Sequence, residues 1–170
     1  MDYEKASQFW IEKDKDSVKM PKEELRKEIE EFLKKRSVCA LATADKDFVR
    51  STPIEYNYID GYFYLFSEGG RKFKALKENK NVSLSVFDPV VSFTELHSLQ
   101  VMGKAEILEQ DCEEYLRIAS YKHLSLEALK KLSHPLYLIK ITPTVFDLLD
   151  SDLKKKGYSS RQEFVVEENK

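Results

Sequence analysis

The chain has 170 residues, 42% of them hydrophobic and 34% charged, which suits one domain with an apolar core. Its net charge of -2 argues against a protein that coats nucleic acid through bulk positive charge. No apolar run is long enough for a transmembrane helix, and residues 1–5 lack the apolar core of an export signal. Cys39 and Cys112 are far apart and fit free thiols in a reducing compartment, so we expect a cytoplasmic protein.

Residues 1–36 are expected to form a helical N-terminal segment, and residues 151–170 a polar tail, of a single domain that spans 1–170. The apolar cluster at residues 9–11 predicts a short docking helix. Pro21 then opens a second helix. The apolar positions that follow keep helical spacing and predict one face packed on the core: Leu25, Ile29, Phe32 and Leu33.

Six strands are expected in the remainder, at residues 37–43, 48–59, 62–67, 82–87, 99–108 and 136–145. Short helices are expected at 70–78 and at 111–132, the latter in one or two pieces, and residues 89–97 read as irregular. Gly103 marks a bend or bulge in its strand. Strands linked mostly by turns predict a mainly β fold with flanking helices, closed as an antiparallel barrel.

Asp60 and Gly61 predict a two-residue turn that pairs Ile59 with Tyr62. Extended outward, this register places residue 56 opposite residue 65, and Arg50 opposite Arg71. The strand at residues 62–66 is apolar on both faces, so its second face is expected to be covered by a helix or by another subunit.

Gly69 and Gly70 are followed by three cations at the start of a predicted helix, Arg71, Lys72 and Lys74. Cations at this end of a helix are unfavourable by about 0.3–1 kcal/mol each, and a bound anion would reverse that effect. The alternative is a solvated basic turn. The predicted arrival of Arg50 beside this turn favours a dianionic ligand, with hydroxyl groups nearby on Ser51, Thr52 and Ser67.

The chain resembles the FMN-binding split-barrel family typified by pyridoxamine 5′-phosphate oxidase, over about residues 32–108. The resemblance rests on the order of four segments: Arg50-Ser51-Thr52-Pro53, Phe66-Ser67-Glu68-Gly69-Gly70-Arg71-Lys72, Asn81-Val82-Ser83-Leu84 and Val101-Met102-Gly103-Lys104-Ala105-Glu106. It implies a six-stranded antiparallel split β-barrel. It also implies a homodimer with two FMN molecules at the subunit interface.

The resemblance also implies a role for each site residue. Arg50 and Lys72 would hold the FMN phosphate, with Arg71 beside them. The other implied contacts are with the isoalloxazine ring or with the phosphate and ribityl chain: Ser51, Thr52 and Pro53 at the ring, Phe66 and Ser67 at the phosphate and ribityl chain, and Gln100, or Ser98 in its place, reaching the flavin.

The expected activity is hydride or electron transfer through FMN, with NAD(P)H as donor and a small-molecule acceptor, and no catalytic residue can be assigned. Activity on vitamin B6 is not expected, because residues 158–162 do not match the substrate-binding motif of those oxidases. Two alternatives remain: a flavin- or haem-binding module without turnover, and a barrel that binds single-stranded nucleic acid, which the net charge disfavours. His97, His123 and His134 lack metal-ligand spacing, so no metal is expected.

Overall fold

The computed structural model describes residues 1–89, 92 and 94–167, and its eight strands form one antiparallel sheet. The strands are β1 (Val38–Asp45), β2 (Phe48–Glu55), β3 (Asn57–Ile59), β4 (Tyr62–Ser67), β5 (Asn81–Phe87), β6 (His97–Leu108), β7 (Tyr137–Asp150) and β8 (Arg161–Val165). The helices are α1 (Tyr3–Asp14), α2 (Lys22–Lys34), α3 (Lys72–Glu78), α4 (Glu113–Tyr121), α5 (Leu126–Lys130) and a 3-10 helix, η1 (Ser151–Lys156).

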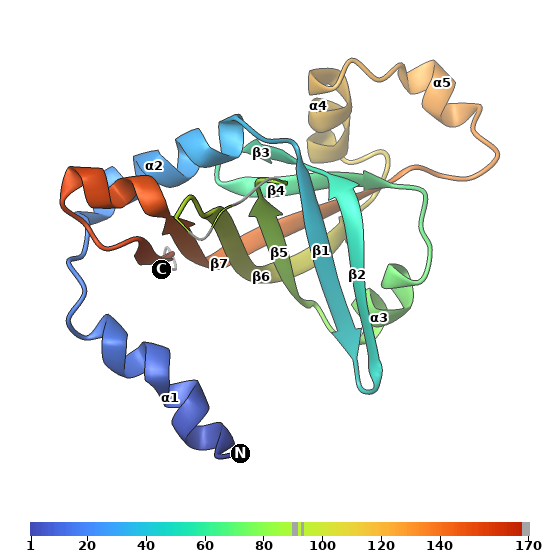
Figure 1. Ribbon diagram of the computed structural model, residues 1–170. Helices are drawn as coiled ribbons and strands as arrows, with labels where there is room; N and C mark the ends of the chain where they lie inside the picture. The colour runs from blue at the N-terminus through green and yellow to red at the C-terminus, as the bar shows by residue number, and fades with distance from the viewer. Residues whose placement is uncertain (90–91, 93, 168–170) are drawn as a thin grey trace.

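The sheet has the order β2-β1-β5-β6-β7-β4-β3 and curls into a half-barrel with helices around it (Figure 1). Its first and last strands, β2 and β3, follow one another in the chain and are joined through Tyr56. The predicted mainly β split barrel is therefore confirmed, with eight strands in the described chain rather than six. Part of the predicted irregular stretch at 89–97, namely residues 90, 91 and 93, lies outside the described residues.

Helix α2 packs against one face of the sheet, as its apolar spacing predicts. This face carries the main core cluster and is called the inner face, and the opposite face is called the outer face. Leu25, Ile29, Phe32 and Leu33 are all buried in one cluster with side chains of the strands. The alternating residues of β5 are buried in the same cluster: Val82, Leu84 and Val86. Both elements could be predicted from the sequence, because the spacing of the apolar residues in each element identifies the face that becomes buried.

The predicted strand at 48–59 is in fact two strands with different partners. The turn at Asp60 and Gly61 has positive φ at both residues, and the ladder from Ile59 to Asn57 keeps the predicted register. Beyond that point the prediction is wrong, because β2 pairs with β1 and places Arg50 beside Thr43. The backbone N–H of Tyr56 donates to the Ser37 carbonyl at 2.8 Å, which keeps the preceding strand on β1.

The C-terminal part of the chain holds more regular structure than its composition suggests. β7 continues to Asp150 instead of ending at residue 145, and the polar tail contains both η1 and β8. β8 pairs with residues 145–149 of β7. The bulge predicted at Gly103 is confirmed, since the β6–β7 register shifts there and a Cβ would lie 2.6 Å from the Thr142 carbonyl oxygen.

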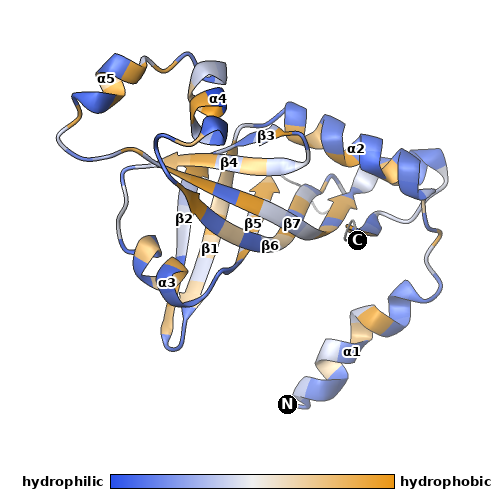
Figure 2. Ribbon diagram, turned by 180° about the vertical axis from the view of Figure 1, so that it is seen from behind, coloured by the Kyte–Doolittle hydropathy of each residue, from blue (hydrophilic) through white to orange (hydrophobic). Residues whose placement is uncertain are grey.

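The second apolar face of β4 is covered by α4. Tyr64, Leu138 and Ile118 are fully buried in a second cluster on this side of the sheet, and Figure 2 shows apolar residues both along β4 and on α4. The sequence predicted that either a helix or another subunit covers this face of β4, and in the structure it is helix α4. In contrast, α1 buries none of its residues, and no described helix has the length and apolarity needed to cross a bilayer.

Candidate functional site

The turn between β4 and α3 is fixed in shape by its own groups. Gly69 and Gly70 have φ of +109° and +93°, which residues with a side chain rarely adopt. The Ser67 hydroxyl accepts the Gly69 N–H at 3.1 Å, and Lys72 Nζ donates to the Gly69 carbonyl at 2.6 Å. Ser67 and Lys72 are only 6% and 8% exposed, so the ammonium is held at the turn.

The start of α3 contributes less than the sequence suggests. The helix begins at Lys72 rather than at Gly70 and has seven residues. The backbone N–H groups of Phe73 and Lys74 already donate to the carbonyls of Gly70 and Arg71, at 3.0 and 3.1 Å. Side-chain cations, rather than unsatisfied helix N–H groups, are therefore the main attraction for an anion here.

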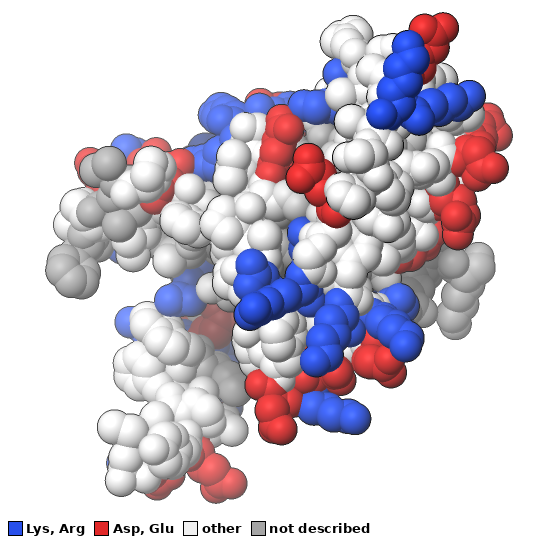
Figure 3. Space-filling view, turned by 90° about the vertical axis from the view of Figure 1, so that its right-hand side faces the viewer, with Lys and Arg blue, Asp and Glu red and all other residues white. Residues whose placement is uncertain are grey.

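Arg50 reaches this turn from β2. Burial lowers the pKa of Lys72, and the nearby Arg50 guanidinium lowers it further. In the part of the chain that the structure describes, Arg50, Lys72 and Arg71 have no carboxylate within ion-pair distance. Figure 3 shows Lys and Arg side chains gathered on the lower part of the face where α3 lies. Arg50 does lie close to Lys72, although by a different strand path from the predicted one.

Two buried hydroxyls lie on the same face of the sheet as Arg50. Thr43 is the register partner of Arg50, and Thr52 is two residues further along β2. The side-chain oxygens of both threonines are buried and have no hydrogen-bond partner among the described residues. A buried hydroxyl left without a partner costs about 1–3 kcal/mol. A polar ligand or water at this place would supply the missing bonds.

The remaining predicted ring contacts lie on the opposite face. The register aligns Pro53, Ala40, Ser85 and Gln100 in one row across four neighbouring strands. Ser51 shares this outer face with the row, while Arg50 and Thr52 point to the inner face. The two groups meet only at β2, which is an edge strand of the sheet. Ser98 lies on the same outer face as Gln100, two residues before it.

Phe66 is placed away from the cation cluster. Its ring packs edge-on against Tyr115 of α4, with the ring centroids 5.8 Å apart. Ser67, the next residue, points to the inner face, as strand alternation requires. Of the predicted pair, Ser67 therefore lies at the turn by its side chain, while Phe66 can offer only its backbone.

A cavity of about 420 Å³ adjoins the outer face beside Gln100. Its lining includes Trp10 from α1, Arg161 from β8 and Asp147 from β7. Burial raises the pKa of Asp147, and its register partner Glu163 raises it further. Asp147 could not be found from the sequence because it faces Gln100 only when β7 continues past residue 145 and pairs with β6. Trp10 could not be found because its approach depends on the position of α1.

The profile of the family described as pyridoxamine 5′-phosphate oxidase matches residues 25–150, which is well over half of the chain. No protein of curated function matches the sequence. The fold, by contrast, is similar to many solved structures.

Three of these structures have a TM-score of 0.58 with the chain. The haem storage protein HutZ from Vibrio cholerae is 19% identical, over 69% of this chain and 88% of its own. An FAD-binding protein from Mesorhizobium loti is 24% identical, over 71% and 89%. A putative pyridoxamine 5′-phosphate oxidase from Listeria innocua is 19% identical, over 74% and 98%. At these identities the likeness establishes the split-barrel fold.

Proposed function

Because the chain belongs to the pyridoxamine 5′-phosphate oxidase family, we propose that it is a flavoprotein that binds FMN and transfers hydride or electrons. One observation carries the proposal: Arg50 approaches the buried Lys72 without a carboxylate partner among the described residues. A phosphate dianion between them would remove their repulsion and form charge-assisted hydrogen bonds. The unpaired hydroxyls of Thr43 and Thr52 on the same face also fit a polar ligand.

In this proposal Arg50 and Lys72 bind the phosphate, with Arg71 beside them and Ser67 holding the turn. Ser51, Pro53 and Gln100 contact the flavin from the outer face, around the β2 edge. FMN, when bound, supplies the hydride and electron chemistry. The chain orients the cofactor and limits its access to water. NAD(P)H as donor, a small-molecule acceptor in the cavity beside Gln100, and the absence of vitamin B6 turnover are parts of the same proposal.

A homodimer belongs to the proposal as well. The outer face of β1, β2, β5 and β6 exposes four large apolar side chains by 46–75%: Val38, Val49, Phe87 and Met102. A second copy of the chain would cover this face and enclose the flavin ring between subunits. The outer face of β4, which first suggested a dimer, is already covered by α4. Sedimentation equilibrium should give a dimer, and a monomer with full flavin occupancy would contradict this part.

The second candidate is a module that holds flavin or haem without turnover. This candidate is supported by the similarity of the fold to that of a haem storage protein. The absorption spectrum of the purified protein separates the two cofactors. Steady-state reduction of an acceptor by NAD(P)H then separates an enzyme from a storage module.

The test of the phosphate site compares FMN with riboflavin, which lacks the phosphate. Arg50→Ala and Lys72→Ala should each weaken FMN binding about tenfold to a hundredfold, because a hydrogen bond to a charged group contributes about 1.5–3 kcal/mol. Riboflavin binding should hardly change. Lys77→Ala is the matched control, since this cation lies on the same helix with its side chain 83% exposed. Equal losses for FMN and riboflavin would show that the cluster does not bind the phosphate.

A further inference from the structure

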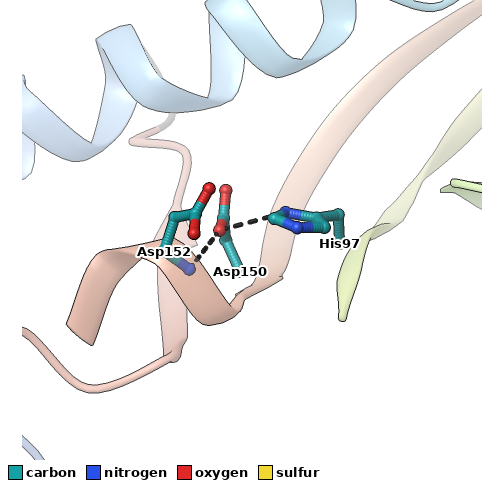
Figure 4. Close-up of side chains that lie close together, drawn as sticks. All are labelled: His97, Asp150 and Asp152. Atoms are coloured by element: carbon teal, nitrogen blue, oxygen red, sulfur yellow. Dashed lines mark hydrogen bonds and ion pairs between the residues drawn. The ribbon is translucent and has the colours of Figure 1, made fainter. Parts of the chain in front are cut away.

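Three possible metal ligands meet at the end of the sheet far from Lys72. His97 is the first residue of β6, and its register partner Asp150 is the last residue of β7. Asp152 follows in η1, and the ligand atoms of all three residues lie within 4.8 Å of one another. Figure 4 shows the imidazole and the two carboxylates converging from the two strand ends and η1.

This cluster stands on well-fixed backbone. Ser151 N–H donates to the Leu96 carbonyl at 3.0 Å, and Leu96 N–H donates to the Ser151 hydroxyl at 2.9 Å. The Asp150 carboxylate accepts the Asp152 N–H at 2.8 Å. The side chains of His97 and Asp150 are only 24% and 18% exposed. Two of the three ligands are thus partly shielded from water and held by a strand ladder, which favours a preorganised site.

The separation of His97 from Asp150 suits two ligands of a small divalent ion. His97 Nδ1 lies 3.1 Å from Asp150 Oδ1. Two ligands of a tetrahedral zinc ion, each at about 2.0–2.1 Å, are separated by about 3.3 Å. Two carboxylates offset the charge of a divalent cation, and one imidazole favours a transition metal over Mg²⁺ or Ca²⁺. We propose that His97, Asp150 and Asp152 bind a Zn²⁺-class divalent metal ion, with a fourth position left for water.

The competing explanation is a plain hydrogen bond between His97 and Asp150, with Asp152 engaged elsewhere. Asp152 does contact Lys155 Nζ at 2.6 Å, but their side chains are 57% and 81% exposed. Exposed pairs of this kind contribute little, so Lys155 can leave without much loss when a metal ion arrives.

The metal ion would act as a clamp rather than as part of the flavin chemistry. It would tie η1, which leads into β8, to the paired ends of β6 and β7. The Ser67–Lys72 turn lies at the opposite end of β7, since Ser67 pairs with Tyr137. The 14 residues of β7 span roughly 45 Å of strand. Metal binding should therefore leave the contacts of the FMN phosphate at Lys72 unchanged.

The test is a titration of the metal-stripped, full-length protein with Zn²⁺ by isothermal calorimetry, together with elemental analysis. The unsubstituted chain should bind one ion with a micromolar or lower Kd. His97→Ala should weaken binding by at least about tenfold. Asp150→Asn should weaken it too, while keeping the side-chain oxygen that accepts the Asp152 N–H. This second variant keeps the test valid if His97→Ala folds poorly.

Two controls test zinc ligands outside the cluster. His134→Ala removes an exposed histidine outside the cluster, and Cys112→Ser removes the more accessible thiol. Burial raises the pKa of the Cys39 thiol to about 12, so this cysteine stays protonated and is a poor ligand. Both controls should bind Zn²⁺ normally. Co²⁺ should give visible absorption bands that disappear in His97→Ala. Absence of binding in the micromolar range, or equal affinity in His97→Ala, would overturn the proposal.

Discussion

The cations beside α4 and the cations beside α3 differ in their partners. Those beside α4 pair with carboxylates, and among the described residues Arg50 and Lys72 beside α3 do not. Next to α4, Glu114 accepts Tyr64 Oη at 2.5 Å and Lys140 Nζ at 3.0 Å. Arg117 of the same helix reaches Asp60 at 2.8 Å. Next to α3, neither Arg50 nor Lys72 has a carboxylate partner in the described chain.

The difference separates a structural network from a binding site. Burial would raise the pKa of Glu114, but hydrogen bonds from Tyr64 and Lys140 hold it below its usual value. The charges beside α4 therefore stabilise one another and attach the helix to β4 and β7. Burial and Arg50 lower the pKa of Lys72, and no carboxylate among the described residues offsets them. A chain keeps such an arrangement at little benefit to stability, which points to a ligand.

The largest expected effect comes from removing a paired cation. Lys140→Met should lower the free energy of unfolding by about 2 kcal/mol, because it leaves the partly buried Glu114 without its ammonium partner. Lys72→Met in the flavin-free protein should change it by less than about 1 kcal/mol, because loss of one hydrogen bond is offset by relief of a buried charge. Urea unfolding of both variants measures this difference. Equal destabilisation would remove the distinction between the two regions.

A smaller effect should appear in acid. Because the folded pKa of Glu114 is lowered, its contribution is fully present above the unfolded value of about 4.3 and is lost as the pH falls through the folded value. Glu114→Gln should lack this component, so the stability gap between it and the unsubstituted protein should narrow between about pH 5 and 3. A gap that stays constant with pH would contradict the sign of the shift.

The elements whose geometry is set by neighbouring residues could be predicted from the sequence. The apolar face of α2, the turn at Asp60 and Gly61, and the bulge at Gly103 all follow from neighbouring residues. β8 was missed because its residues are largely polar, and it is a strand only by pairing with β7. The break between β2 and β3 at Tyr56 was missed because it depends on Ser37, a distant residue that directly precedes β1.

The candidate site divides in the same way. The cations at residues 50 and 71–72 could be found from charge and turn chemistry, even though the extended register was wrong. The unpaired hydroxyl of Thr43 and the approach of Asp147 to Gln100 require the true strand order. The meeting of His97 with Asp150 joins residues 53 positions apart, so no spacing rule could reveal it.

The position of β7 has a consequence for synthesis of the chain. One edge of β7 pairs with β6, and the other is shared by β4 and β8. The aromatic strand β4 leaves the ribosome about seventy residues before its partner β7, because Ser67 pairs with Tyr137. Until β7 is made, the edge of β4 that pairs with it has unpaired backbone N–H and C=O groups beside apolar side chains. Unpaired strand edges of this kind promote aggregation. A chain interrupted before β7 therefore carries an exposed template for misassembly, and chaperone contact should concentrate on β4 during this interval.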